Sequence, residues 1–311
     1  MKQATRLNTS THATSSTAFR TFTRLSAVVA LAGAAAGFAT TATAAPTGFG
    51  LIAYWGETAS TYGGQVPTGS YVVINPNSGA QGLSASQITN WKAVIANIRA
   101  QGGKVLGYVP TGYDRNTADE LTRYNAIPTE LSAYKNTLGG VDGFFFDEAA
   151  HDDASLTDAQ KCSGTQTKWA NVRSMVSGSG AGGIKVWNAG WPGASGCFVS
   201  AAQSGEHIVM YEAAYADYLN GASWLNGDVQ NLATSLNVKT WLLIHSATQA
   251  QMQATLKGTT ANYVYVTSMT YNPSLPWGGP IWNYTPTYWG NDTTSGTERW
   301  CLKSLKSGGS C

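Results

Sequence analysis

Three carboxylate residues stand at the ends of apolar runs in this sequence of 311 residues. Asp147 and Glu148 follow three consecutive phenylalanines, and Glu212 closes a largely apolar run that begins at His207. An ionised carboxylate beside an apolar segment is costly unless it is paired or hydrogen-bonded, and burial raises its pKa toward the range that suits a general acid. The alternative is that Asp147 or Glu148 merely caps a helix or pairs with an arginine. We interpret all three acids as candidate catalytic residues.

Carboxyl groups on two separate elements are what glycoside hydrolysis requires. One carboxylic acid protonates the leaving oxygen, while a second carboxylate attacks the anomeric carbon or activates water. A separation of about 5 Å implies retention of configuration, and about 6.5–9.5 Å implies inversion. Side chains alternate along a strand, so Asp147 and Glu148 should point in different directions unless a bulge intervenes. The residues alone leave open which of the two faces the substrate.

Eight short runs rich in β-branched and aromatic residues are predicted to be the strands that position these acids. They are Phe49–Trp55, Tyr71–Asn75, Lys104–Val109, Gly143–Asp147, Ile184–Asn188, His207–Glu212, Thr240–His245 and Tyr263–Met269. Eight strand–helix units predict an α/β fold of the (β/α)8 TIM-barrel type. The alternative is an open doubly wound sheet, which usually carries a GxGxxG turn after its first strand, and no such turn occurs here.

The expected helices lie between these strands. Ser86 is predicted to cap a helix that Gly102-Gly103 ends. The others are expected at Ala118–Tyr124, Thr129–Leu138 (started by Pro128), Thr167–Val176, Leu225–Leu236 and Thr248–Leu256. The stretch from Glu57 to Ser70 shows no clear helix and Phe198–Ser204 is short, which would leave the outer helical ring incomplete.

The active site of such a barrel lies at the carboxyl ends of its strands. Besides the three acids, the candidate substrate-binding residues there are Asn75, Tyr113, Asn188, His245 and Trp277. The chain holds 11 Trp and 15 Tyr, and aromatic faces beside amide and hydroxyl groups suit an uncharged sugar. We interpret His245 as an oriented or core histidine rather than as a catalyst.

The first 44 residues have the order of a secretory signal peptide. A basic leader without acids precedes an apolar run from Leu25 to Phe38, and Ala42-Thr43-Ala44 is a small-x-small cleavage signal. The run is short for a membrane span of about 20 residues. Cleavage would leave residues 45–311 as a single secreted domain.

Four cysteines suggest two disulfides in an exported chain. Three pairings are possible. We favour Cys162–Cys197, which we expect in consecutive loops, and Cys301–Cys311, which would close a short tail. Neither the cysteines nor the consecutive residues His151-Asp152-Asp153 have the spacing of a metal site, so no metal or other cofactor is predicted.

The formal net charge is +2, and Lys and Arg are scattered along the chain. Nucleic acid requires a dense basic face, so it is not the expected partner, and nothing favours an anionic membrane surface. The expected partner is a polysaccharide, bound by a monomer.

Three motifs resemble the spherulin 4 family, also called spherulation-specific family 4, which includes glycoside hydrolase family 135. They are Tyr71-Val-Val-Ile-Asn-Pro-Asn-Ser-Gly79, Val105-Leu-Gly-Tyr-Val-Pro-Thr111 and Val141-Asp-Gly-Phe-Phe-Phe-Asp-Glu-Ala149. The resemblance runs from about Ile52 to Trp282. It implies a (β/α)8 hydrolase of N-acetylgalactosamine polymers such as galactosaminogalactan, an endo-α-1,4-N-acetylgalactosaminidase that is expected to retain configuration.

The resemblance also implies roles for the acids. Asp147 would be the nucleophile and Glu212 the general acid/base, with Glu148 orienting or tuning them. The family usually carries Asn-Pro-Gly after the fifth strand, whereas this chain has Asn188-Ala-Gly190, which leaves the exact sugar in doubt. Two alternatives stay open: a non-catalytic polysaccharide- or cell-wall-binding protein on the same fold, and a metal-dependent polysaccharide deacetylase.

Overall fold

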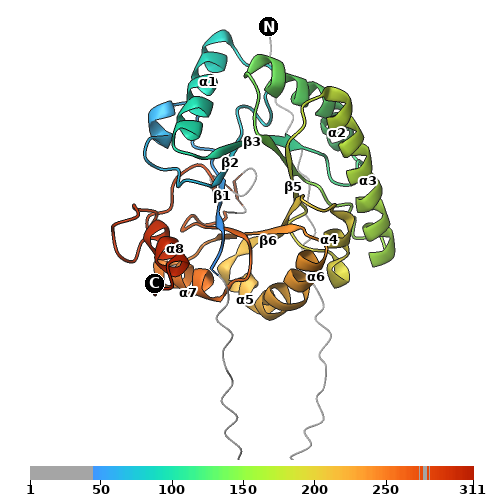
Figure 1. Cartoon of the computed structure of the whole chain (residues 1–311). Coiled ribbons are helices and arrows are strands. Elements are labelled where there is room, and N and C mark those ends of the chain that lie inside the picture. Colours follow the sequence, from blue (N-terminus) through green and yellow to red (C-terminus); the bar gives the residue numbers. More distant parts are fainter. Residues whose placement is uncertain (1–44, 273, 276–278, 280) are drawn as a thin grey trace, which may run out of the picture. The chain divides into compact units, whose positions relative to one another are not determined.

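Eight parallel strands close into a barrel in sequence order, as Figure 1 shows. The computed structural model describes residues 45–272, 274–275, 279 and 281–311. The strands are β1 (Gly48–Ile52), β2 (Tyr71–Ile74), β3 (Lys104–Pro110), β4 (Gly143–Asp147), β5 (Ile184–Asn188), β6 (His207–Ala214), β7 (Lys239–His245) and β8 (Tyr263–Val266). The predicted (β/α)8 fold and all eight predicted strands are confirmed, with shifts of a few residues at the ends.

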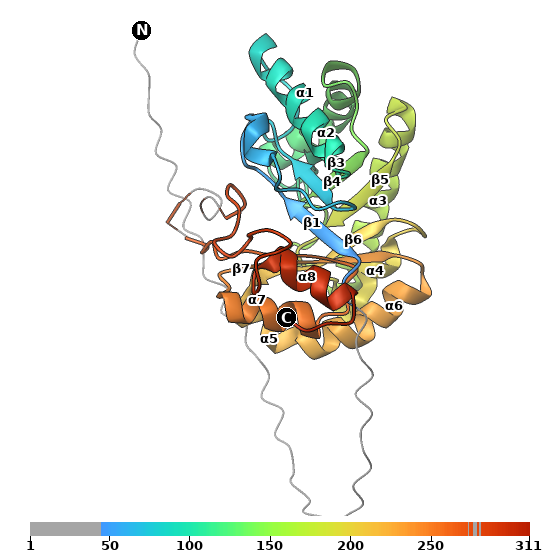
Figure 2. The ribbon, with the colours of Figure 1, turned by 60° about the vertical axis from the view of Figure 1, so that its left-hand side comes forward.

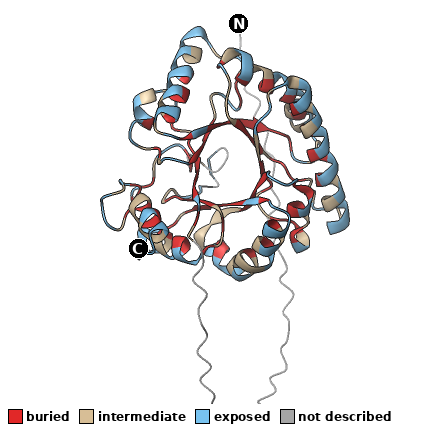
Figure 3. Cartoon of the chain, in the orientation of Figure 1, coloured by how far each residue is buried: buried red, intermediate tan, exposed pale blue. Residues whose placement is uncertain are grey.

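The strands are buried on both faces, which explains their nearly continuous apolar sequences. All four residues of β2 and β8 are buried, and Figure 3 shows the buried residues following the ring of strands and the inner faces of the helices. Inside the barrel, rings of Tyr71, His207, Trp241 and Tyr263 contact one another near the amino ends of their strands. This layer forms a packed floor beneath the carboxyl ends.

Helices surround the barrel. The α-helices are α1 (Ala85–Ala100), α2 (Ala118–Ser132), α3 (Asp158–Ser179), α4 (Cys197–Ala201), α5 (Tyr215–Trp224), α6 (Gln230–Ser235), α7 (Gln249–Gly258) and α8 (Glu298–Lys306). Shorter turns are η1 (Ala59–Tyr62), η2 (Ala133–Thr137), η3 (Ala194–Gly196) and η4 (Leu225–Val229). Reciprocal capping boxes begin α1, α2, α3 and α7, so local chemistry fixes where these helices start.

Three predicted helix starts were wrong. The helix expected from Thr167 is α3, which already begins at Asp158 behind the Thr157 cap. The cap of α1 is Ser84, not Ser86, because Gln87 both donates its N–H to the Ser84 hydroxyl and accepts the Ser84 N–H. Pro128 does not start a new helix but lies inside α2. The helix continues past Pro128 while its buried residues Tyr124, Ile127 and Leu131 face inward and the helix packs on β3. In the following turn η2, the Tyr134 ring lies against Gly107 and its hydroxyl donates to the Tyr108 carbonyl.

The outer ring is uneven. Between β1 and β2 the chain forms only the 3-10 turn η1, as its Gly- and Pro-rich sequence predicted. Helices α5 and α8 were not predicted. Helix α8 follows a long connection after β8 and packs beside α7 near the C-terminus (Figure 2). The region predicted as one helix at Leu225–Leu236 is the π-helical turn η4 followed by α6.

Both predicted disulfides are present. Cys162 pairs with Cys197 at a Cα–Cα distance of 5.7 Å, and Cys301 pairs with Cys311 at 4.7 Å. The first does not join two loops as expected, because Cys162 lies in α3 and Cys197 begins α4. Among the described residues, no helix is long and apolar enough to cross a membrane.

Candidate active site

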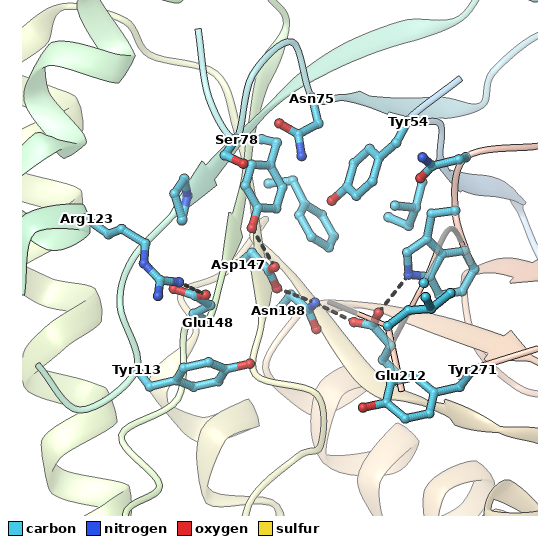
Figure 4. Close-up of a pocket in the computed structure, with 18 of the residues that line it drawn as sticks. Tyr54, Asn75, Ser78, Tyr113, Arg123, Asp147, Glu148, Asn188, Glu212 and Tyr271 are labelled. Atoms are coloured by element: carbon cyan, nitrogen blue, oxygen red, sulfur yellow. Dashed lines mark hydrogen bonds and ion pairs between the residues drawn. The ribbon is translucent and has the colours of Figure 1, made fainter. Parts of the chain in front are cut away.

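A cavity of about 920 Å³ opens at the carboxyl ends of the strands, where the barrel fold predicts a site. Its lining includes all three predicted acids, and Figure 4 shows their side chains among aromatic and amide groups. Among its lining residues are Tyr54, Asn75, Tyr108, Tyr113, Asp119, Arg123, Asp147, Glu148, Asn188, Glu212, Tyr271 and Trp282.

Asp147 is the last residue of β4, and its carboxylate lies in the cavity. The Tyr108 hydroxyl donates to Oδ2 over 2.9 Å, and Asn188 Nδ2 donates to Oδ1 over 2.7 Å. Burial raises the pKa of Asp147, while these two hydrogen bonds act in the opposite direction by stabilising the carboxylate.

Glu212 approaches from β6. Asn188 Nδ2 donates to its Oε2 over 2.6 Å, and the Trp282 indole N–H donates to its Oε1 over 3.1 Å. Burial and the nearby charge of Asp147 raise the pKa of Glu212 to about 7. At neutral pH a substantial share of Glu212 therefore carries a proton.

Asn188 joins the two acids through one nitrogen. Because its bonds to Asp147 and Glu212 are 2.7 and 2.6 Å long, the two accepting oxygens lie no more than 5.3 Å apart. The Gly190 N–H donates to Asn188 Oδ1 over 3.1 Å, which orients the amide so that its NH2 group faces the carboxyl groups. Asn188, the candidate residue predicted at the end of β5, therefore binds both acids.

A bulge in β6 sets the direction of Glu212. Val209 pairs with Trp241, but Tyr211 pairs with Leu242, so Met210 is an additional residue in the ladder. His207 belongs to the interior floor, and regular alternation from it would point residue 211, not residue 212, into the barrel. The additional residue brings Glu212 to the inside.

Glu148 also lines the cavity, but its carboxylate turns away from the Asp147–Glu212 pair. Its backbone is left-handed (φ 55°), and its carboxylate accepts the Gly112 N–H over 3.0 Å and an ion pair from Arg123. Arg123 also pairs with Asp119 at the cavity edge. Burial and Asp147 raise the pKa of Glu148, and Arg123 opposes this shift. Asp147 faces Glu212, and Glu148 lies at the side.

The other predicted contacts divide into three groups. Asn75, Tyr113 and Asn188 line the cavity. His245 does not appear among the described lining residues; its ring lies beside those of Tyr271 and Trp282, with centroids 6.1 and 6.5 Å away, and its Nδ1 is 2.9 Å from the Ser246 hydroxyl. Burial lowers its pKa. Trp277 lies outside the described residues.

Several lining residues were not predicted. Tyr54 and Tyr108 stand two residues from the inward positions Ile52 and Pro110, so strict alternation along the strands could have identified them. Trp282 belongs to the long connection after β8, where no strand or helix periodicity in the sequence indicates which way a side chain points. In the ranges that the structure describes, no group of three or more His, Cys, Asp or Glu side chains is placed to hold a metal ion.

The sequence model of spherulation-specific family 4 matches residues 49–294. No curated protein matches the chain. Among solved structures, Sph3 of Aspergillus clavatus in complex with GalNAc is similar, with 20% identity, 78% of this chain and 95% of that chain covered, and a TM-score of 0.48. A mutant O-GlcNAc hydrolase of Thermobaculum terrenum shows 10% identity, 70% and 54% coverage and a TM-score of 0.43. A mutant β-hexosaminidase of Streptomyces plicatus with GlcNAc shows 13% identity, 78% and 45% coverage and a TM-score of 0.35.

Proposed function

This chain belongs to spherulation-specific family 4, and from that premise we propose that it is a retaining glycoside hydrolase of an amino-sugar polysaccharide. The observation that carries the proposal is the Asp147–Asn188–Glu212 arrangement. Its two carboxyl oxygens lie within 5.3 Å of each other, closer than the separation of about 6.5 Å at which inverting pairs begin.

The environments of the two acids support opposite protonation states. Asp147 accepts hydrogen bonds on both oxygens and lies next to a loop that holds the Lys168 ammonium, so it ionises first. The resulting negative charge raises the pKa of Glu212, which keeps its proton. A carboxylate nucleophile beside a protonated acid is the pair that retaining hydrolysis needs.

In the first step, an Asp147 oxygen bonds to the anomeric carbon while the glycosidic C–O bond breaks. Glu212 gives its proton to the leaving oxygen, so the departing sugar is a neutral alcohol. In the second step, Glu212 takes a proton from water, the water oxygen bonds to the anomeric carbon, and the ester to Asp147 breaks. Both residues return to their starting states.

The surrounding residues serve this pair. Tyr108 and Asn188 hold the Asp147 carboxylate, and Asn188 and Trp282 hold Glu212. Glu148, paired with Arg123, tunes the pair by its charge at the side. Tyr54, Tyr113 and Tyr271 are aromatic groups of the cavity wall, suited to stacking on sugar rings.

For the substrate, we propose an α-1,4-linked N-acetylgalactosamine polymer cut internally. The three sequence motifs that resemble the family support this choice. The test is digestion of a glycan panel, with product masses and the anomeric configuration of the first product followed by NMR. Internal cleavage with retained configuration is expected. Binding without products would favour the non-catalytic polysaccharide-binding alternative, and EDTA-sensitive acetate release would favour a deacetylase.

We further propose that residues 1–44 are a secretory signal and that residues 45–311 form one secreted domain. The two disulfides support this, because such bonds persist in oxidising compartments. Mass spectrometry of the N-terminus of the exported protein tests it, and a mature chain that begins elsewhere than Ala45 would contradict the proposed cleavage.

A further inference from the structure

Lys168 is a lysine with no solvent-exposed surface, located on α3 directly beneath the loop that follows Asp147. Its Nζ lies within hydrogen-bonding distance of four main-chain carbonyls. Two belong to the loop after β4, Glu148 (2.7 Å) and Ala150 (3.4 Å). The other two belong to the loop after β3, Gly112 (3.1 Å) and Tyr113 (2.7 Å). One ammonium thus connects the two loops beside the proposed acids.

The neighbouring residue of α3, Trp169, also binds the loop after β4. Trp169 donates its indole N–H to the Ala149 carbonyl over 2.9 Å. Lys168 and Trp169 together therefore bind three consecutive carbonyls, those of residues 148, 149 and 150. The Thr111 hydroxyl also contacts the carbonyls of Asp147 (2.8 Å) and Glu148 (2.9 Å).

These hydrogen bonds fix an unfavourable backbone conformation at Glu148. Glu148 has a φ of 55°, a left-handed conformation that disfavours residues other than glycine and persists only where surrounding contacts impose it. The turn separates the two carboxylates, so that Asp147 meets Asn188 while Glu148 meets the Gly112 N–H. Both partners of the second contact lie in loops held by Lys168.

A buried ammonium is costly, so its retention needs a reason. No ion pair joins Lys168 to a carboxylate in the part of the chain that the structure describes. Burial and then Arg115 lower its pKa to about 7, while Glu148, Asp114 and Glu120 oppose the shift. A methionine would fill similar space without the charge, so packing does not explain the lysine.

We propose that Lys168 is a positioning residue for the proposed glycosidase: its ammonium fixes the loops after β3 and β4 in the arrangement that separates Asp147 from Glu148. This inference rests on the proposed function. The competing explanation is that Lys168 only stabilises the fold, in which case its loss would lower the melting temperature but leave kcat per folded molecule unchanged.

The test compares Lys168→Met with Lys135→Met in the full chain. Lys135 is a matched control, because it is exposed and its Nζ also donates to a carbonyl, that of Ser179, over 3.1 Å. For K168M we expect kcat to fall about 10- to 100-fold, the effect of displacing catalytic groups by up to about 1 Å. KM should change less than kcat, because Lys168 is not among the described residues that line the cavity and it holds the Tyr113 loop through a main-chain carbonyl rather than through the ring. K135M should retain both values.

A second measurement does not depend on activity. Amide hydrogen exchange followed by mass spectrometry should accelerate in residues 111–114 and 148–151 of K168M, and not in the strands. If the wild-type chain cleaves no glycan, the proposed function fails, yet this exchange experiment still decides whether Lys168 orders the two loops.

If K168M does not fold, three other variants test the proposal: Lys168→Arg, Lys168→Gln and Thr111→Val. T111V removes only the hydroxyl contacts to the carbonyls of residues 147 and 148, and should lower kcat with little change in KM. K168R keeps the charge and should be more active than Lys168→Gln. Wild-type kcat in folded K168M, or wild-type kcat in both T111V and K168Q, would overturn the proposal, as would unchanged exchange in both loops.

Discussion

Trp282 donates its indole N–H to Oε1 of Glu212 over 3.1 Å, although 70 positions separate the two residues in the chain. The indole reaches the acid from the connection after β8, and its ring packs against Tyr265 with ring centroids 5.6 Å apart. Glu212 is therefore held from two sides, by Trp282 and by Asn188. Both hydrogen bonds lower the pKa of Glu212, in opposition to burial.

Replacing Trp282 with Phe should move the alkaline limb of the kcat/KM profile to higher pH. Glu212 must be protonated to act as an acid, so activity falls as the pH passes its pKa of about 7. Phe cannot donate, so the pKa should rise by about one unit, the value of one hydrogen bond to a charged group. Initial rates from pH 4 to 9 measure this, and an alkaline limb that stays in place or moves down would contradict it.

Replacing Tyr108 with Phe should instead move the acid limb. The Tyr108 hydroxyl stabilises ionised Asp147, so its removal raises the pKa of Asp147. The nucleophile is then protonated at a higher pH, and activity at low pH falls. The same rate measurements apply, with W282F as the reciprocal control. A shift of the alkaline limb alone in Y108F would show that the two acids have been assigned the wrong roles.

Asp147→Asn and Glu212→Gln should each remove most activity while the fold survives. Loss of general acid catalysis costs about 10²- to 10⁴-fold in rate, and loss of the nucleophile should cost at least as much. Asp228→Asn, at an exposed position in η4, is a matched control. Circular dichroism and kcat on the preferred glycan provide the readout. Full activity in either acid variant would disprove its assignment.

Glu298→Gln should stabilise the protein above neutral pH. Glu298 has no exposed surface, and burial raises its pKa well above 4.5. Between the unfolded and folded pKa values only the folded state holds the proton, so this group makes stability fall as pH rises through that window. Gln stays neutral and keeps an acceptor for the Val266 N–H. Melting temperatures from pH 5 to 9 should decline less steeply in E298Q; parallel curves would refute this.

The two disulfides should differ in their effect on stability. Closing a loop of 35 residues contributes about 4 kcal/mol in the chain-entropy model, and a loop of 10 residues about 3 kcal/mol. The double variant Cys162→Ser/Cys197→Ser should therefore unfold at a lower urea concentration than Cys301→Ser/Cys311→Ser. Urea unfolding followed by tryptophan fluorescence measures the difference, and the reverse order would count against it.

The sequence predicted the site residues at the strand ends better than those that reach the site from distant segments of the chain. The local pattern of a polar residue that interrupts or ends an apolar strand identified Asp147, Asn188 and Glu212. It did not identify Trp282 and Arg123, because their contacts join distant segments. The position of His245 beside the rings of Tyr271 and Trp282 depends in the same way on the fold of the long connection after β8.

Helix positions show the same division. The start of α7 was predicted within one residue because Thr248 and Gln251 form a local capping box. By contrast, α2 runs through Pro128, because tertiary packing of its apolar face outweighs the local preference of proline. Lys168 appeared only as part of an amphipathic helix, and no local pattern indicates that its ammonium meets four carbonyls.

The additional residue in β6 makes the direction of Glu212 depend on how many residues the strand holds and on whether it is bulged, as well as on which residues they are. Removing Met210 alone would keep every charged and aromatic group in the chain and would leave Glu212 two places after Val209, so strict alternation would still point its carboxylate into the barrel. A relative with a regular strand at this point would therefore need one residue fewer between Val209 and Glu212 to present the same acid, whereas the same number of residues without a bulge would turn that acid outward. In comparing such sequences, the number of residues between two landmarks matters as much as their identities.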